Sequence, residues 1–189
     1  MTRIIAGTAG GRRLKTPTGD GTRPTTDRVR EALFSAVDAA LGSLAGLRFL
    51  DLYAGSGAVG LEARSRGAGV VTLVENDRRT ATLIRDNARS LGMTHVDVVA
   101  QQATRALAGP PRAPYDVAYL DPPYSLPTGE VVLVLDALLG GGWLAPDALV
   151  VVERSGRSGP LPWPAGLTGD RERQYGETML WYGRPTTRP

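Results

Sequence analysis

The residues with the clearest chemistry form two motifs, a glycine-rich loop and an acidic turn with two prolines. The loop has the spacing G-x-G-x-x-G at Gly55, Gly57 and Gly60, directly after an apolar run that contains Asp51. Glycines permit a tight turn and a close approach of the backbone to a ligand, and a helix that starts there presents free N–H groups. Glu75 lies 20 residues after Gly55 and follows the next apolar run, where a carboxylate can accept hydrogen bonds from ribose hydroxyls. This motif indicates a cofactor that carries a nucleoside.

Two cofactor classes fit the loop. Dinucleotides such as NAD place a pyrophosphate at the helix N-terminus, whereas S-adenosylmethionine carries an ammonium, a carboxylate and no phosphate. The carboxylate of Asp51, four residues before Gly55, would repel a pyrophosphate but can accept from an ammonium group, directly or through water. A P-loop is excluded because no G-K-[S/T] follows the glycines. Asp51 therefore favours S-adenosylmethionine.

The second motif is Asp121-Pro122-Pro123-Tyr124, which follows the apolar run 115–120. Two prolines fix the backbone and remove two N–H donors, so the Asp121 carboxylate and the Pro122 carbonyl form a rigid surface of acceptors. Such a surface suits the NH₂ group of a nucleobase, because holding its hydrogens favours a nitrogen aimed at a methyl donor. Tyr124 can stack on a base that has left its helix or loop. Catalysis would then rest on positioning and electrostatics.

Apolar runs that alternate with helical patterns surround both motifs and predict an α/β fold. The predicted strands span 47–52, 70–74, 96–100, 115–120 and 148–153, and the predicted helices span 59–66, 78–91 and 130–139. Near-continuous apolar strands between helices indicate a mostly parallel sheet buried on both faces, with a ligand crevice at the carboxyl ends of its strands. Two further runs, 170–175 and 178–182, predict a closing antiparallel pair and seven strands in all.

The N-terminal segment is basic. Short runs at 3–6 and 12–15, joined by a glycine-rich turn, predict a hairpin, and a loop then leads to a helix with Val29, Leu33, Val37 and Leu41 at helical spacing. Residues 1–35 hold seven basic and three acidic residues. Their net charge of +4 exceeds the net charge of the whole chain, +3. We therefore divide the chain into a basic hairpin and loop, 1–25, and a main domain, 26–189.

Composition excludes several kinds of site. The chain has no cysteine and a single histidine, His95, which excludes disulfides, thiol catalysis and thiolate zinc sites and argues against a Ser-His-Asp triad. With 42% apolar and 22% charged residues, the chain is typical of a globular protein. No apolar stretch is long enough to span a membrane. We expect a cytoplasmic monomer that uses no metal and no membrane.

Together the two motifs resemble class I S-adenosylmethionine-dependent methyltransferases that act on amines. The stretches Arg3–Gly7, Gly11–Leu14 and Arg23–Phe34 resemble the bacterial 16S rRNA (guanine(966)-N(2))-methyltransferase family, RsmD, and the likeness covers residues 3–183. The resemblance implies a Rossmann-like class I methyltransferase fold, with the basic 1–25 segment as an RNA-binding extension. It also implies methyl transfer to the exocyclic N2 amine of a guanine in 16S rRNA, in the small ribosomal subunit or its assembly intermediate.

The resemblance implies roles for single residues. The catalytic positions are Asp121, Pro122 and Tyr124. The cofactor-binding positions are Asp51, Tyr53, Gly55, Gly57, Glu75, Asn76 and Gln102, and the RNA-binding positions are Arg12, Arg13, Lys15, Arg23, Arg28 and Arg30. Gln102 departs from the pattern, because related enzymes often have Asp or Asn there, although its amide oxygen can still accept from the adenine amine.

Three alternatives stay open. A DNA adenine-N6 methyltransferase would share the Asp-Pro-Pro-Tyr turn, but it must also recognise a duplex sequence, and no target-recognition domain is evident. An NAD-dependent oxidoreductase would share the glycines and Glu75 and leave the turn unexplained. A non-catalytic RNA-binding module predicts that Asp121→Ala leaves function unchanged. Glu153, at the end of the predicted strand 148–153, has no assigned role.

Overall fold

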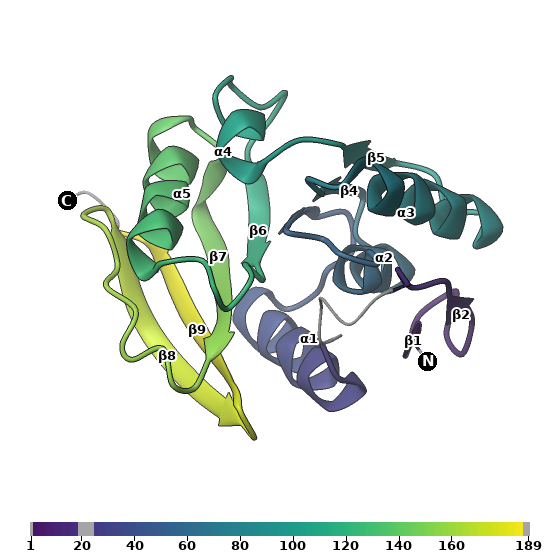
Figure 1. Cartoon of the computed structure of the whole chain (residues 1–189), viewed down its shortest axis with the longest axis horizontal. Coiled ribbons are helices and arrows are strands. Elements are labelled where there is room, and N and C mark those ends of the chain that lie inside the picture. The colour runs from purple at the N-terminus through teal and green to yellow at the C-terminus, as the bar shows by residue number, and fades with distance from the viewer. Residues whose placement is uncertain (1, 19–24, 187–189) are drawn as a thin grey trace.

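The computed structural model describes residues 2–18 and 25–186, and within these residues seven strands form one mixed sheet (Figure 1). Its strands are β3 (Arg48–Leu52), β4 (Val70–Val74), β5 (Val96–Val99), β6 (Tyr115–Leu120), β7 (Leu144–Ser155), β8 (Leu167–Tyr175) and β9 (Thr178–Pro185). The helices are α1 (Asp27–Leu41), α2 (Ala58–Ser65), α3 (Arg78–Ser90), α4 (Ala103–Ala106) and α5 (Thr128–Gly140). A separate N-terminal hairpin consists of β1 (Thr2–Arg3) and β2 (Arg13–Leu14).

The strand order across the sheet is β5, β4, β3, β6, β7, β9, β8. Strands β3 to β7 are parallel to one another, and β9 runs antiparallel to both of its neighbours. Leu52 pairs with Val74 on one side and with Leu120 on the other, so three central strands end at the same level. The prediction of an α/β fold with a mostly parallel, seven-stranded sheet and a closing antiparallel pair is confirmed.

Alternate residues along the strands face two separate cores. Phe49 and Val71 pack with residues of α1, α2 and α3, whereas Leu50 and Val150 pack with residues of α4 and α5. This division follows from the two-residue period of a strand, which sends successive side chains to opposite faces. Because helices cover both faces, as predicted, polar groups of the central strands gather at the carboxyl ends.

Helix α1 fixes the position of the loop that precedes it. Its N-cap is Thr26, whose hydroxyl accepts from the Val29 N–H at 3.3 Å and satisfies a backbone donor of the first turn. The apolar face of the helix, which includes Leu33 and Val37, packs against the sheet. This anchoring places Thr25 immediately outside the helix.

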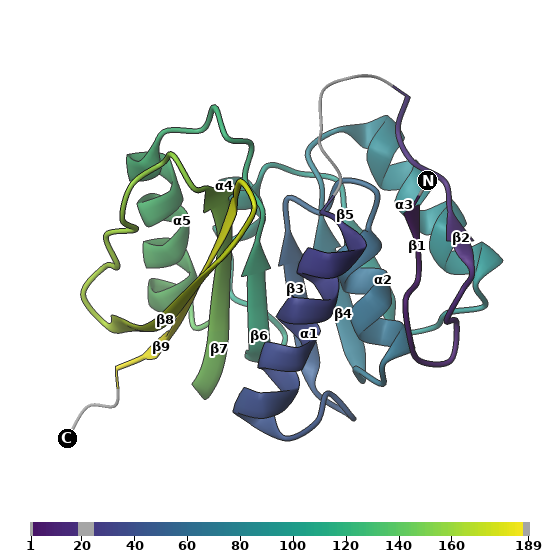
Figure 2. The ribbon, with the colours of Figure 1, turned by 90° about the horizontal axis from the view of Figure 1, so that it is seen from below.

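The N-terminal hairpin packs against α2 and α3 (Figure 2). The Glu62 carboxylate of α2 accepts from the N–H groups of Ile5 and Ala6 at 2.7 and 2.9 Å. The backbone passes so close to α2 that a Cβ on Gly7, whose φ is +79°, would lie 1.9 Å from the Ser65 carbonyl oxygen. These contacts fix the hairpin to α2. Its strands have only two residues each and are shorter than the predicted 3–6 and 12–15.

Two further differences from the prediction concern one short helix and the start of one strand. Helix α4 was not predicted, and β8 begins at Leu167 rather than at residue 170. Trp163 closes over the β8–β9 pair, where a Cβ on Gly169 would lie 2.3 Å from its indole nitrogen.

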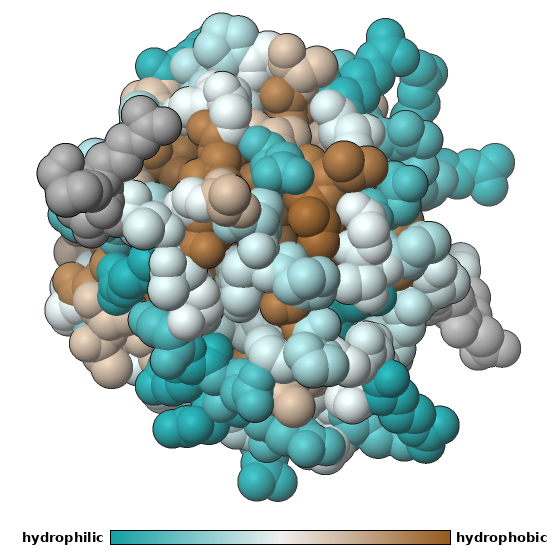
Figure 3. Space-filling view, turned by 90° about the vertical axis from the view of Figure 1, so that its left-hand side faces the viewer, coloured by the Kyte–Doolittle hydropathy of each residue, from teal (hydrophilic) through white to brown (hydrophobic). Residues whose placement is uncertain are grey.

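Apolar groups lie between polar ones on the side of the molecule formed by α5 and β8 (Figure 3). Leu133 of α5 is 56% exposed. Over the described ranges, no helix combines the length and apolarity that a membrane span requires.

Candidate active site

Four carboxylates lie at or near the carboxyl ends of four adjacent strands. Asp51 is on β3, Glu75 follows β4, Asp121 follows β6 and Glu153 is on β7. The register pairs Leu120 with Val152, which places Asp121 level with Glu153. Ligands of open parallel sheets bind in this crevice, so the two sequence motifs belong to one site.

The glycine loop adopts the backbone conformation that its sequence predicts. Gly55 and Gly57 have φ values of 56° and 81°, in the left-handed region that favours glycine. A Cβ on Gly55 would meet no described atom within 4 Å, so this part of the loop borders open space. A Cβ on Gly60 would lie 2.6 Å from the Leu73 side chain, so the third glycine lets α2 pack closely on the sheet.

Tyr53 directly precedes this loop and also has a positive φ, 64°. For a residue with a bulky side chain this conformation is strained, and such strain concentrates at ligand sites. Burial raises the pKa of the Tyr53 hydroxyl above its ordinary value. The side chain is half-buried and packs beside the core below α5.

Asp51 is almost completely buried, with 1% of its surface exposed. Its Oδ2 accepts from the Gly60 N–H at 2.8 Å, whereas Oδ1 has no hydrogen-bond partner in the described part of the chain. Burial, with a smaller contribution from the charge of Glu75, raises the pKa of Asp51 to about 8 against the opposing Gly60 hydrogen bond. A buried carboxylate oxygen without a donor is costly, so the group suits a ligand that brings a donor or a positive charge.

Glu75 fixes the loop from the neighbouring strand. Its Oε2 accepts from the Gly55 N–H and its Oε1 from the Asp77 N–H, both at 2.9 Å. A carboxylate has further lone pairs, so these bonds orient Glu75 without exhausting its capacity. Asn76 and Gln102 are exposed, and Gln102 is the N-cap residue of α4. The structure brings Asp51, Gly55 and Glu75 together and leaves the roles of Asn76 and Gln102 as predictions.

The Asp-Pro-Pro-Tyr turn is attached to the end of the sheet. The Asp121 N–H donates to the Leu52 carbonyl at 3.3 Å, which continues the β3–β6 pairing. Pro122 is buried, and Tyr124 is 45% exposed. Arg154, which sequence reasoning missed, donates to the carbonyls of Pro123 and Leu126 at 3.3 and 2.8 Å. Its buried guanidinium therefore holds the turn in place.

Three further groups surround Asp121. The Thr25 hydroxyl lies 3.4 Å from Oδ2 of Asp121 and 3.4 Å from Oε2 of Glu153. The Tyr119 hydroxyl donates to the same Glu153 oxygen at 2.5 Å. One signal in the sequence indicates this cluster, an acid at the end of the predicted strand 148–153, and none indicates Thr25 or Tyr119.

Burial raises the pKa of Asp121 well above its ordinary value, and the negative charges of Glu153 and Asp51 raise it further. Burial also raises the pKa of Glu153, against the hydrogen bonds from Tyr119 and Thr25. A carboxyl group with a raised pKa holds a proton more readily at neutral pH. The crevice therefore offers acceptors that can also take up a proton.

The predicted RNA-binding cations differ in their exposure to solvent. Arg12, Arg13, Lys15 and Arg28 are exposed, whereas Arg23 lies outside the described residues. The prediction for Arg30 is wrong: this side chain is fully buried. It donates to the Arg3 carbonyl and the Asp27 carboxylate, both at 2.7 Å, and lies 3.7 Å from Glu62. Arg30 therefore connects α1 to the hairpin and α2 and cannot reach RNA.

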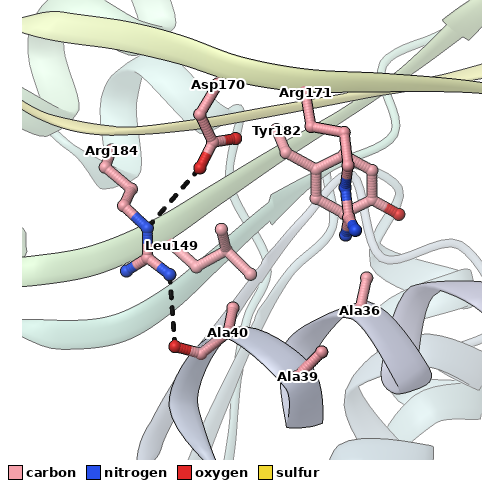
Figure 4. Close-up of a pocket in the computed structure, with 8 residues that line it drawn as sticks. All are labelled: Ala36, Ala39, Ala40, Leu149, Asp170, Arg171, Tyr182 and Arg184. Atoms are coloured by element: carbon pink, nitrogen blue, oxygen red, sulfur yellow. Dashed lines mark hydrogen bonds and ion pairs between the residues drawn. The ribbon is translucent and has the colours of Figure 1, made fainter.

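A groove of about 280 Å³ lies between α1 and the β8–β9 pair (Figure 4). Small alanines of α1 line one side, and Arg184 crosses the groove to the Ala40 carbonyl at 3.2 Å and to Asp170 at 3.7 Å. Arg171 lies over the Tyr182 ring, 4.6 Å from its centroid. None of the predicted site residues lines this groove, so it is separate from the crevice. Within residues 2–18 and 25–186, no three His, Cys, Asp or Glu side chains form a group that could hold a metal ion.

Comparison with known proteins points in one direction. Residues 2–184 match the model of a family named Conserved hypothetical protein 95. Ribosomal RNA small subunit methyltransferase D of Escherichia coli K12 is 38% identical over 183 residues, which cover 93% of this chain and 85% of that protein. The protein of the same name from Haemophilus influenzae is 36% identical, over 92% of this chain and 89% of its own. The solved structure of Escherichia coli yhhF aligns with a TM-score of 0.86 at 34% identity over 97% of both chains.

Proposed function

Because this chain belongs to the Conserved hypothetical protein 95 family, as its likeness to the ribosomal RNA small subunit methyltransferase D proteins indicates, we propose a methyltransferase function for it. The substrate is the exocyclic N2 amine of a guanine in 16S rRNA, and the methyl donor is S-adenosylmethionine. The observation that carries the proposal is the placement of the Asp121 carboxylate beside the glycine loop, at the ends of two paired strands.

The crevice has the groups that this cofactor requires. The unpartnered Oδ1 of Asp51 can accept from its ammonium group, and the open space at Gly55 leaves room for its methionine part. Glu75 can accept from the ribose hydroxyls, and Tyr53, Gly57, Asn76 and Gln102 complete the proposed site. A pyrophosphate would instead place negative charge beside the Asp51 carboxylate, which disfavours NAD. When bound, S-adenosylmethionine supplies an electrophilic methyl group on a sulfonium.

Asp121 and Pro122 act on the nucleophile. The carboxylate of Asp121 and the carbonyl of Pro122 accept the two N–H hydrogens of N2, which turns the nitrogen lone pair outward. The nitrogen must release a proton once it carries the methyl group. Asp121 is the acceptor, because burial and the neighbouring carboxylates raise its pKa and make it a stronger base than an exposed aspartate.

The target base must leave its stack to reach Asp121, at a cost of a few kcal/mol. Tyr124 offsets part of this cost, because stacking of a base on an aromatic ring contributes about 1–3 kcal/mol. The exposed cations Arg12, Arg13, Lys15 and Arg28 bind backbone phosphates, and Arg23 joins them in this proposal. The enzyme acts as a monomer on the small subunit or its assembly intermediate.

Transfer of labelled methyl from S-adenosylmethionine tests the proposal. Small subunits that lack the modification, naked 16S RNA and duplex DNA are compared as acceptors. We expect label in the subunits, recovered as N2-methylguanosine after digestion to nucleosides. Label recovered as N6-methyladenosine from DNA would establish the DNA methyltransferase alternative, and tight NAD binding without S-adenosylmethionine binding would establish an oxidoreductase.

A further inference from the structure

A cavity of about 200 Å³ lies between the start of α1, the turn after β6 and the end of the β8–β9 pair. Thr25, Tyr124 and Glu153 are among the residues that line it. Thr25 connects the cavity to Asp121, because its hydroxyl lies 3.4 Å from Asp121 Oδ2. The cavity therefore adjoins the acceptor that holds N2 in the proposed reaction.

Glu153 contributes a buried carboxylate to this cavity. Only 4% of the residue is exposed. Oε2 takes the hydrogen bonds from Tyr119 and Thr25, and no described residue donates to Oε1. The neighbouring Arg154 is directed to the carbonyls of Pro123 and Leu126 and forms no ion pair with Glu153. Among residues 2–18 and 25–186 no cation forms an ion pair with Glu153. A buried carboxylate in this situation is costly, which indicates a site for a ligand that brings a hydrogen-bond donor.

Guanine has the matching donors. On its Watson–Crick edge, the N1–H lies next to the exocyclic N2 amine, so a base whose N2 meets Asp121 directs N1–H to the adjacent acceptor. Glu153 is adjacent, because the Thr25 hydroxyl is 3.4 Å from both carboxylates and the β6–β7 register places the two acids level. In adenine and in other purines without a 6-oxo group, N1 carries a lone pair instead of a hydrogen.

We propose that Glu153 accepts the N1–H of the target guanine while Asp121 holds N2, and that Glu153 thereby selects guanine over purines that lack N1–H. This inference rests on the proposed function. Tyr119 and Thr25 fix the carboxylate by occupying Oε2, which leaves Oε1 for the base. A purine with a lone pair at N1 would face the Glu153 oxygen without a hydrogen between them, and the loss of one such base contact reduces the rate by about 10- to 100-fold.

The test uses small subunits reconstituted with 16S RNA that carries either guanosine or 2-aminopurine riboside at the target position. 2-Aminopurine keeps the N2 amine and lacks N1–H. We expect the unaltered enzyme to methylate guanosine about 10- to 100-fold faster than 2-aminopurine. Equal rates on the two bases would overturn the inference, whereas absence of transfer to guanosine would instead overturn the proposed function.

Glu153→Gln separates base recognition from the intrinsic reactivity of the two amines. When the amide oxygen accepts from Tyr119, the variant presents an NH₂ group to the base. The rate on guanosine should fall by about 10- to 100-fold while the rate on 2-aminopurine does not, so that the preference disappears. A preference that persists in the variant would contradict the role of Glu153.

Glu172→Gln is the matched control, because Glu172 is exposed on β8 and the substitution makes the same change in charge. It should retain the preference for guanosine. Affinity for S-adenosylmethionine and the thermal unfolding midpoint of Glu153→Gln show whether the variant folds. Should it not fold, equal rates of the unaltered enzyme on guanosine and 2-aminopurine would still overturn the inference.

Discussion

The Gly60 N–H donates to Oδ2 of Asp51 at 2.8 Å and leaves Oδ1 of the same buried carboxylate without a partner among the described residues. The third glycine of the loop motif, in the first turn of α2, thus fixes an acid whose second oxygen the described residues do not satisfy. Functional sites commonly carry such local costs, because the group is arranged for a ligand rather than for the unliganded protein.

Asp51→Asn should therefore stabilise the protein and weaken cofactor binding. We expect the free energy of unfolding to rise by about 1–3 kcal/mol near pH 8, because a neutral amide replaces an acid whose ionisation at this pH is easier in the unfolded state than in the buried site. Affinity for S-adenosylmethionine should fall by about 10- to 100-fold, since the charge-assisted hydrogen bond to its ammonium is lost. Urea denaturation and calorimetric titration measure the two effects, and unchanged affinity would remove Asp51 from the cofactor site.

The stabilisation by Asp51→Asn should depend on pH. The pKa of Asp51 in the folded protein, about 8, lies above its ordinary value of 3.8, so between these values the folded state holds a proton that the unfolded state has released. The free energy of unfolding of the unaltered protein falls as the pH rises through this window, and the variant lacks this contribution. The difference between the two proteins should be small near pH 4 and increase toward pH 8. A constant difference would contradict the raised pKa.

Glu75→Ala should weaken cofactor binding and leave the chemical step nearly intact. Glu75 fixes the Gly55 N–H and is the proposed ribose acceptor, but it does not touch the proposed position of the base. We expect an increase of about tenfold or more in the KM for S-adenosylmethionine, with kcat changed far less. Steady-state kinetics at saturating RNA separates the two, and a fall in kcat at unchanged KM would contradict the assignment.

Replacement of Arg12 and Arg13 by Ala should weaken binding of RNA and reduce its dependence on salt. Both side chains are exposed on the hairpin, and each phosphate contact that is lost reduces the slope of log K against log salt by about 0.7–0.9. Filter binding of subunits or 16S RNA over a salt series measures the slope. A slope equal to that of the unaltered protein would exclude both residues from the RNA surface.

Arg30→Ala should lower the free energy of unfolding. This buried side chain bonds to Arg3 and Asp27 and lies 3.7 Å from the fully buried Glu62. Its removal takes one of two cations from Glu62, which keeps Arg66 at 2.8 Å, and breaks the bonds that connect α1 to the hairpin. We expect a loss of about 3–5 kcal/mol in the free energy of unfolding, measured by urea denaturation. A variant as stable as the unaltered protein that binds RNA less tightly would restore the original assignment to the RNA surface.

The sequence predicted the sheet well because its strands are buried on both faces. The bounds of β4 and β6 agree with the predicted runs, which are almost continuously apolar. The hairpin was predicted too long because the N–H groups of Ile5, Ala6 and Ala9 bond to Glu62 and Ser65 of α2 rather than across the hairpin. Such a tertiary contact leaves no periodic pattern in the sequence.

The candidate site could be predicted only in part. Asp51, Gly55 and Asp121 come together because parallel strands end at the same edge, which is a property of the fold class. The contact between Thr25 and Glu153 joins residues 128 positions apart, and no local spacing indicates it. Arg30 carried a signal that a count of charges ignores: it is three, four and seven residues before Leu33, Phe34 and Val37, on the apolar face of α1.

The most direct test of the account compares Asp121→Ala with the unaltered enzyme on small subunits that lack the modification, with nucleoside analysis of the product. The account predicts N2-methylguanosine from the unaltered enzyme and a loss of about 100-fold or more in turnover for the variant, with little change in affinity for S-adenosylmethionine. Equal turnover by the two proteins, or a methyl group on any nucleoside other than guanosine, would contradict it.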